Sequence, residues 1–252
     1  MHRFAAITLL AGIASARGLT LEQAVAVART NHPALAALRC RIEAAAGRAE
    51  QARLWPNPEL ELFSEDFPPN RGGFASAKNM VGISQTIPVP GKKSLDTRIG
   101  QQQITAARLE YALRERQVVQ AVQSAFYRAL AAQKKVAVGE ELVALSRSLL
   151  QVASQRIAAG SAGEPERLRA EIELDRATIE LATLQQQLTE AKLALAEAMG
   201  QSHNTIATLQ GELRTQVPTP TPAPTDTKLL AQHPAIRATA AAREQAELEL
   251  RR

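Results

Sequence analysis

The feature that most constrains this chain is a stretch from Ser94 to Ala159 that contains no proline and only two glycines, Gly100 and Gly139. A helix over these positions, about 66 in number, would be on the order of 100 Å long at the usual rise per residue. No small globular domain needs a rod of this length. The stretch therefore predicts an elongated helical protein.

Apolar residues within this stretch recur at alternating steps of four and three, the spacing of a coiled-coil seam. The seam falls into three segments: Leu95, Ile99, Gln102, Ala106, Leu109 and Leu113; then Val118, Val122, Ala125, Ala129, Ala132 and Val136; then Val138, Leu142, Leu145, Leu149 and Val152. Offsets between segments rotate the seam around the helix and let it meet different neighbours. Its many small residues favour a wall of closely packed helices.

A second long helix is predicted to fold back on the first. Gly160 is suited to cap the first helix, and Pro165 fits the first turn of the next. The second helix, residues 164–199, repeats the seam spacing and ends at Gly200. Residues 94–199 are therefore predicted to form a long antiparallel helical hairpin.

Residues 55–93 depart from the helical character of the segments on either side, and the strand pair is predicted within them, over residues 58–88. Alternating polar and apolar residues predict strands over Pro58–Asp66 and Asn79–Pro88, joined by a loop of turn-forming residues. Three glutamates, Glu59, Glu61 and Glu65, fall on the face opposite Leu60 and Leu62. An isolated strand pair is only marginally stable in water, so this pair requires partners from outside itself.

The segments before the strand pair predict an export signal and a helix. Residues 1–16 have a charged start, an apolar run and an Ala-Ser-Ala site, which predict an export signal. A helix is expected over residues 19–54, with Thr20 as its cap, although Glu22 stands one position too early for a capping box. Pro33 should kink or divide this helix, and Ser94 is expected to cap the long helix.

The chain also predicts an internal repeat. Asn31-His32-Pro33-Ala34 is restated as Gln232-His233-Pro234-Ala235, at an offset of about 200 residues. Residues 17–216 would be a first repeat, 217–227 a proline-rich linker and 228–252 the start of a second repeat. A full second half would bring a second strand pair.

Composition excludes several classes of protein. The net charge of +5 arises from basic residues interspersed with acids, which indicates solvated helix surfaces rather than a nucleic-acid site. The single cysteine, Cys40, cannot form an internal disulfide. The four histidines are isolated, and no catalytic, phosphate-binding or metal-ligand motif is present. We expect no enzymatic activity, no cofactor and no metal site.

Four groups of residues resemble the TolC family of outer-membrane efflux ducts. They are Leu19-Thr-Leu-Glu-Gln-Ala24 with Asn31-His32-Pro33; Trp55-Pro-Asn-Pro58; Ser84-Gln-Thr-Ile-Pro-Val-Pro-Gly-Lys92; and Arg156 to Gly160 with Glu166 and Ala170. The resemblance covers essentially the whole chain. Phe67 after Glu65-Asp66, together with Gly91-Lys92, is most similar to the heavy-metal cation branch of the family.

This resemblance implies a mainly α fold, in which a long helical hairpin belongs to a periplasmic tunnel and the β-hairpin contributes to an outer-membrane β-barrel. It implies a homotrimer in contact with outer-membrane lipid, a periplasmic adaptor (membrane fusion protein) and an inner-membrane RND-type pump. Arg156, Gly160, Ser161 and Glu166 become the candidate adaptor contacts at the hairpin tip. Glu59, Glu61 and Glu65 become candidate lumen-facing residues, as ordinary polar lining in preference to a selectivity site.

Other interpretations remain open at this point. One strand pair per chain gives three copies half of the expected barrel, so the chain is either a non-functional fragment of a duct or assembles as six copies, and we prefer the fragment. A periplasmic coiled-coil protein similar to an adaptor is a further alternative, although no flanking β segments of the adaptor type are visible.

Overall fold

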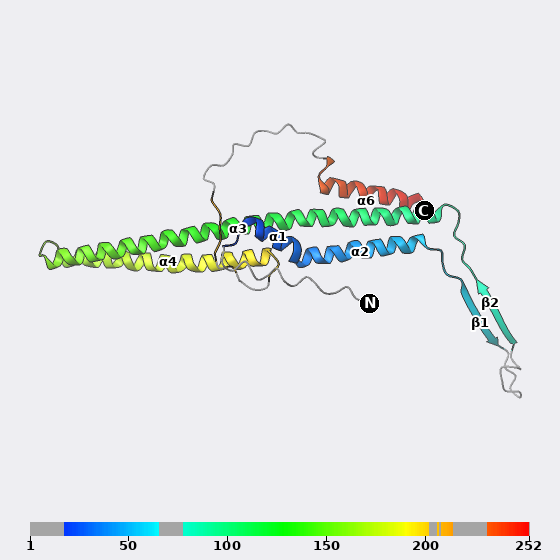
Figure 1. The fold of residues 1–252 in the computed structure, drawn as a ribbon, viewed down its shortest axis with the longest axis horizontal. Coiled ribbons are helices and arrows are strands. Elements are labelled where there is room, and N and C mark those ends of the chain that lie inside the picture. The colour runs from blue at the N-terminus through cyan, green and yellow to red at the C-terminus, as the bar shows by residue number, and fades with distance from the viewer. Residues whose placement is uncertain (1–17, 66–77, 202–205, 207, 214–230, 252) are drawn as a thin grey trace, which may run out of the picture. The chain divides into compact units, whose positions relative to one another are not determined.

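A computed structural model describes residues 18–65, 78–201, 206, 208–213 and 231–251. The elements run in the order α1 (Leu21–Asn31), α2 (Pro33–Arg53), β1 (Glu59–Glu65), β2 (Lys78–Ser84), α3 (Lys92–Ala158), α4 (Glu164–Ala198) and α6 (Pro234–Arg251) (Figure 1). The predicted fold class, mainly helical with one antiparallel strand pair, is confirmed. The predicted export signal, the whole of the predicted linker and most of the strand-joining loop lie outside the described residues.

The start of α1 carries a capping signal that was not predicted from the sequence. Thr20 and Gln23 form a complete capping box, in which the Thr20 hydroxyl accepts from the Gln23 amide and the Gln23 side chain accepts from the Thr20 amide. Glutamine serves at the third helical position as well as glutamate does. The predicted cap at Thr20 is therefore confirmed, and the capping box judged imperfect because of Glu22 is in fact complete.

Pro33 divides the first helix, as predicted, and His32 caps the helix that follows. Nδ1 of His32 accepts a hydrogen bond from the Ala34 amide at 3.2 Å. His233 makes the same contact with the Ala235 amide, at 3.3 Å, where α6 begins. An imidazole takes the place that Ser or Asp usually occupies at a helix start.

The long helix α3 contains 67 residues, close to the prediction, but it begins two residues earlier than expected. Gly91, with φ of 89°, makes the turn that precedes it. Ser94 is not the cap: it lies inside the first turn, and its hydroxyl donates to the Gly91 carbonyl at 2.6 Å. The left-handed backbone of Gly91 sets the helix start, because only glycine adopts it without strain.

The chain divides into two compact units, one made of residues 1–37 and 113–224 and the other of residues 38–112 and 225–252. In the first unit, the second half of α3 and α4 form the predicted antiparallel hairpin (Figure 1). A β-carbon added at Gly139 of α3 would meet Leu184 and Leu181 of α4 at 3.0 and 3.3 Å. Small residues therefore set the close approach of these two helices.

The third segment of the predicted seam is exposed in the single chain and does not face α4. Its members are exposed by 64%, 46%, 56%, 55% and 52% of their surface: Val138, Leu142, Leu145, Leu149 and Val152. The buried positions lie one residue further on, at Val143, Ser146 and Ala153, in line with Gly139. Small residues allow α4 to come close, and the larger apolar residues one position earlier are turned away from it. The second segment is confirmed, since Val118, Val122 and Ala129 are buried.

The core of the first unit surrounds Phe126, which is 1% exposed. Gln133 of α3 binds the segment around Leu209 to this core. Its side-chain amide donates a hydrogen bond to the Leu209 carbonyl and accepts one from the Leu209 backbone amide. Leu19 pairs with Leu209 in a parallel bridge. At the end of α4, Gly200 has φ of 74°.

In the second unit, α2 packs antiparallel on the first part of α3. Gly100 lies so close to α2 that an added β-carbon would stand 2.9 Å from Cα of Ala49. Arg41 pairs with Glu110 at 2.6 Å, and Arg39 lies over the ring of Tyr111. Ile99 and Leu109 are buried, which confirms the first segment of the seam.

The strand pair also belongs to the second unit. β1 and β2 are antiparallel, with Leu60 opposite Ile83 and Leu62 opposite Val81. The second strand was predicted to reach Pro88, but it ends at Ser84. The reason is pairing: Ser84 faces Glu59, the first residue of β1, and Pro58 before it has no amide hydrogen to donate. The predicted range of the strand pair, 58–88, is therefore too long at its second end.

Candidate functional sites at the hairpin tip and the strand pair

The hairpin tip is built by a glycine that reverses the chain after α3. Gly160 has φ of 72°, as its predicted role as a helix cap requires. The Ser161 amide donates to the Arg156 carbonyl at 2.9 Å, and the Gly160 amide donates to the Ile157 carbonyl at 2.9 Å. These two bonds close the last turn in the manner of a Schellman motif.

All four residues predicted for adaptor contact meet at this tip. The Arg156 guanidinium forms an ion pair with Glu166 of α4, which joins the two helices directly. The Ser161 hydroxyl donates to the Arg156 carbonyl at 2.9 Å. Gly160 and Ser161 are exposed, and an added β-carbon at Gly160 would meet nothing within 4 Å. The tip is therefore internally fastened and open to solvent on its outer surface.

A second group of charges at the tip was not predicted. Arg167 pairs with Glu164 one turn earlier and lies 3.5 Å from Glu171 one turn later. The hydrogen bond from Arg167, followed by its positive charge, lowers the pKa of the Glu164 carboxyl. Acidic residues in the first turn of α4 also suit the positive end of the helix dipole. The signal was available in the sequence as charges spaced three and four apart.

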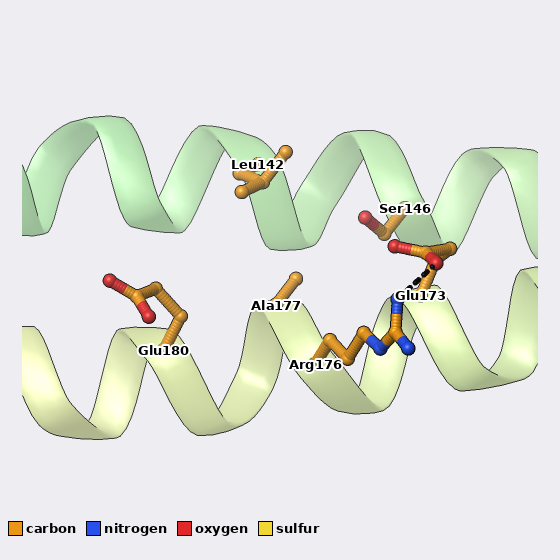
Figure 2. A pocket seen from close by; sticks show the side chains of 6 residues that line it. All are labelled: Leu142, Ser146, Glu173, Arg176, Ala177 and Glu180. Atoms are coloured by element: carbon orange, nitrogen blue, oxygen red, sulfur yellow. Dashed lines mark hydrogen bonds and ion pairs between the residues drawn. The ribbon is translucent and has the colours of Figure 1, made fainter.

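A groove between α3 and α4 lies further along the hairpin (Figure 2). Its lining residues come from both helices: Leu142, Ser146, Glu173, Arg176, Ala177 and Glu180. Ser146 is 6% exposed, and the Glu173 to Arg176 ion pair measures 3.0 Å. Because Ser146 and Ala177 are small, the helices come close here, and we interpret the groove as a feature of hairpin packing.

The three glutamates of the strand pair lie on one face, as predicted. Glu59 is opposite Ser84, Glu61 is opposite Gly82 and Glu65 is opposite Lys78. Lys78 was not predicted for this face, and its ammonium lies 3.7 Å from the Glu65 carboxylate. The face therefore carries less negative charge than the three glutamates alone suggest. Its remaining pair is Phe63 with Met80.

The strand pair is exposed on both faces. On the face opposite the glutamates, Leu60, Leu62, Val81 and Ile83 are exposed by 65%, 71%, 70% and 77%. In the described part of the chain, no helix is long and apolar enough to cross a membrane. No cluster of three or more His, Cys, Asp or Glu that could hold a metal ion occurs among these same residues.

These features define a fold in which exposed β-strands lie in the chain between a shorter helix, α2, and a long packed helical hairpin, α3 and α4. The solved structure of the Campylobacter jejuni CmeC outer membrane channel has this fold, with a TM-score of 0.70 at 16% identity, over 90% of this chain and 51% of that one. The sequence model for outer membrane efflux proteins matches residues 24–201, and the chain belongs to that family. The family consists of transport proteins, and membership places this chain in the outer membrane, with its helices in the periplasm.

Two curated relatives are similar in sequence. The cobalt-zinc-cadmium resistance protein CzcC of Cupriavidus metallidurans is 29% identical over 207 residues, which are 77% of this chain and 46% of the relative. The nickel-cobalt-cadmium resistance protein NccC of Alcaligenes xylosoxydans xylosoxydans is 26% identical over 143 residues, which are 54% of this chain and 32% of the relative. The chain thus spans less than half the length of these relatives.

Proposed function

We propose that this chain is a duct component of a tripartite efflux pump and provides a passive export path for small solutes. The observation that carries the proposal is the combination of a long α3–α4 hairpin with a strand pair whose two faces are both exposed. The hairpin has the length for a periplasmic tunnel wall. The strand pair has apolar residues on one face and glutamates on the other, as a membrane barrel with a wet interior requires.

Heavy-metal cations are the proposed cargo. The two relatives named above are resistance proteins for cobalt, cadmium, zinc and nickel. Glu59, Glu61 and Glu65 would line the lumen and favour cations over anions. Because Lys78 pairs with Glu65, we assign these residues the role of polar lining rather than of a selectivity site.

The proposed assembly contains further strands, supplied by other copies or by a second repeat. The matching histidine caps at His32 and His233 support the division into a first repeat over residues 17–216, a linker over 217–227 and a second repeat that starts at 228. A homotrimer in outer-membrane lipid, with an adaptor at the hairpin tips and an RND-type pump beyond it, follows from the family resemblance.

Metal tolerance tests the function. The chain would be expressed in a strain that keeps its adaptor and pump but lacks their duct, and growth in cobalt, zinc and cadmium would be measured. We expect restored tolerance and recovery of the protein with the outer membrane. Recovery in the soluble periplasm without any change in tolerance would refute the proposal and favour a non-functional fragment.

Site-directed crosslinking tests the tip. With Cys40→Ser as the background, Ser161→Cys at the tip should crosslink to the adaptor, whereas Ser148→Cys, on the exposed side of α3, should not. The double variant Arg156→Ala/Glu166→Ala should weaken this crosslink, and Glu173→Ala/Arg176→Ala, a matched pair on the same hairpin, should leave it intact. A crosslink from the tip to the pump itself would instead favour the adaptor-like alternative.

A further inference from the structure

Apolar and basic residues gather where the chain enters β1 and leaves β2. Leu54 and Trp55 precede β1 and are exposed by 55% and 61%. Ile87 and Val89 follow β2 and are exposed by 77% and 69%. Lys92 and Lys93 begin α3. We call these six residues the base patch, and all of them belong to the same compact unit.

Hydrogen bonds hold the base patch in its exposed form. The Gln85 side chain donates to the Pro56 carbonyl at 2.7 Å and thereby joins the two connecting segments. The Lys92 amide donates to the Val89 carbonyl at 3.1 Å, across the turn made by Gly91. Prolines at 56, 58, 88 and 90 restrict the backbone further. The apolar side chains are therefore held toward solvent by the backbone around them.

The charge of the base patch is positive. The Lys93 ammonium lies 4.1 Å from the centroid of the Trp55 ring, in a cation–π contact. The first turn of α3 contains no acidic residue. Among the ion pairs of the described residues, none involves Lys92 or Lys93. Two positive charges thus border exposed apolar side chains.

We propose that the base patch binds the headgroup layer of an anionic phospholipid surface. Trp55 would lie at the boundary between headgroups and acyl chains, where the amphipathic indole is most stable. Leu54, Ile87 and Val89 would enter the upper acyl region, and the two lysines would bind lipid phosphates. The proposal rests on the proposed function, because it takes the strand pair to lie in a membrane. It adds the residues and the lipid charge that set how deeply the strand pair enters that membrane.

Charge and spacing favour lipid over a protein partner. A helix partner is expected at apolar residues with steps of four and three, as found on α3, and the base patch has no such spacing. A cationic patch beside apolar side chains complements a surface that offers phosphates above hydrocarbon. A second copy of this chain would bring the same positive charges to the contact, and they would repel one another.

Tryptophan fluorescence reads this site directly, because Trp55 is the single tryptophan of the chain. The purified full-length chain would be added to vesicles of phosphatidylethanolamine with phosphatidylglycerol, and to vesicles of phosphatidylcholine alone. We expect a blue shift and stronger binding with the anionic vesicles. Lipids brominated close to the headgroup should quench Trp55 more than lipids brominated near the chain ends.

Two pairs of lysines supply the matched comparison. Lys92→Gln/Lys93→Gln should weaken binding to anionic vesicles by about 30-fold, since each basic residue near such a surface contributes about one kcal/mol. Lys134→Gln/Lys135→Gln removes two neighbouring exposed lysines from the same helix and should change binding less than about twofold.

Three results would overturn the proposal. They are Trp55 emission that does not change with either kind of vesicle, an equal loss of vesicle binding in the two double lysine variants, and quenching of Trp55 that is strongest with lipids brominated near the ends of their acyl chains. None of them bears on metal tolerance or on outer-membrane recovery in cells. A duct that works while Trp55 stays in water would refute the lipid contact alone, whereas loss of tolerance with a quenched Trp55 would refute the proposed function alone.

Discussion

Replacing Gly200 by alanine should destabilise the unit that contains α4 more than the same change at the hairpin tip. Both glycines have left-handed backbones, with φ of 74° at Gly200 and 72° at Gly160. Their surroundings differ. A β-carbon at Gly200 would stand 2.8 Å from Cα of His32 and 2.8 Å from Cδ of Pro33, whereas at Gly160 it would meet nothing within 4 Å.

The size of the expected loss of stability follows from two contributions: the left-handed backbone and the contacts of the added β-carbon. A left-handed alanine costs about 1–2 kcal/mol at either position. At Gly200 the clash adds about 1–3 kcal/mol, because the obstructing atoms belong to the backbone and to a rigid ring. The change that alanine makes in the unfolded chain is common to both variants and cancels when the two are compared with each other. We therefore expect Gly200→Ala to cost about 2–5 kcal/mol and Gly160→Ala about 1–2 kcal/mol.

Urea unfolding in detergent, followed by helical circular dichroism, would measure the difference from the midpoint and slope of each transition. Substitution by asparagine separates the backbone cost from the clash, since asparagine tolerates a left-handed backbone better than alanine but still carries a β-carbon. Gly160→Asn should recover most of its loss, and Gly200→Asn should not. Equal midpoints for Gly200→Ala and Gly160→Ala would refute the close approach of α4 to the His32-Pro33 junction.

Three further results are expected. Gly47→Ala should stabilise the fold by up to about 1 kcal/mol, since its β-carbon enters open space beside α2. Gly100→Ala should destabilise the fold by about 1–3 kcal/mol, because its β-carbon would clash with Ala49. The urea midpoints of the two variants measure both effects, and a stabilising Gly100→Ala would contradict the close packing of α2 on α3. A double-mutant cycle on Arg156 and Glu166 should give no more than about 1 kcal/mol, because the pair is exposed, and a larger coupling would show a tip more rigid than described. Burial, and then the positive charge of Arg114, lower the pKa of His32, so the folded chain binds this proton less readily than the unfolded chain. The contribution of His32 to stability should therefore be fully present above the unfolded pKa of about 6.5 and should be lost as the pH falls through the lower folded pKa. In His32→Asn the urea midpoint should depend less on pH over that range.

The helix ends could be predicted because local chemistry determines them. Gly160 and Gly200 end α3 and α4 at the expected positions, and Pro33 and Pro165 lie in the first turn of a helix, as their fixed backbone angle favours. Pairing between distant residues was less accessible. The end of β2 depends on which residue of β1 it faces, and the Lys78 to Glu65 contact depends on the same register.

The third segment of the seam shows what residue spacing alone does not determine. Val138, Leu142, Leu145, Leu149 and Val152 have the spacing of a seam, and so do Gly139, Val143, Ser146, Leu150 and Ala153, one residue further on. Spacing shows that both faces of the helix are suited to helix packing, but it does not say which partner each one meets. The first set contains the larger apolar residues, whereas the close contact with α4 uses the smaller residues of the second.

A helix with two adjacent seams is built for neighbours on two sides. α4 occupies one seam of α3, and the other remains exposed among the residues that the structure describes. The strand pair has the same character, since its apolar face is exposed as well. Exposed apolar surface on this scale is costly for a protein that stays monomeric in water. The two exposed surfaces lie in different compact units, and each is accounted for by the proposed duct: neighbouring helices would cover the seam, and lipid with further strands would cover the strand pair.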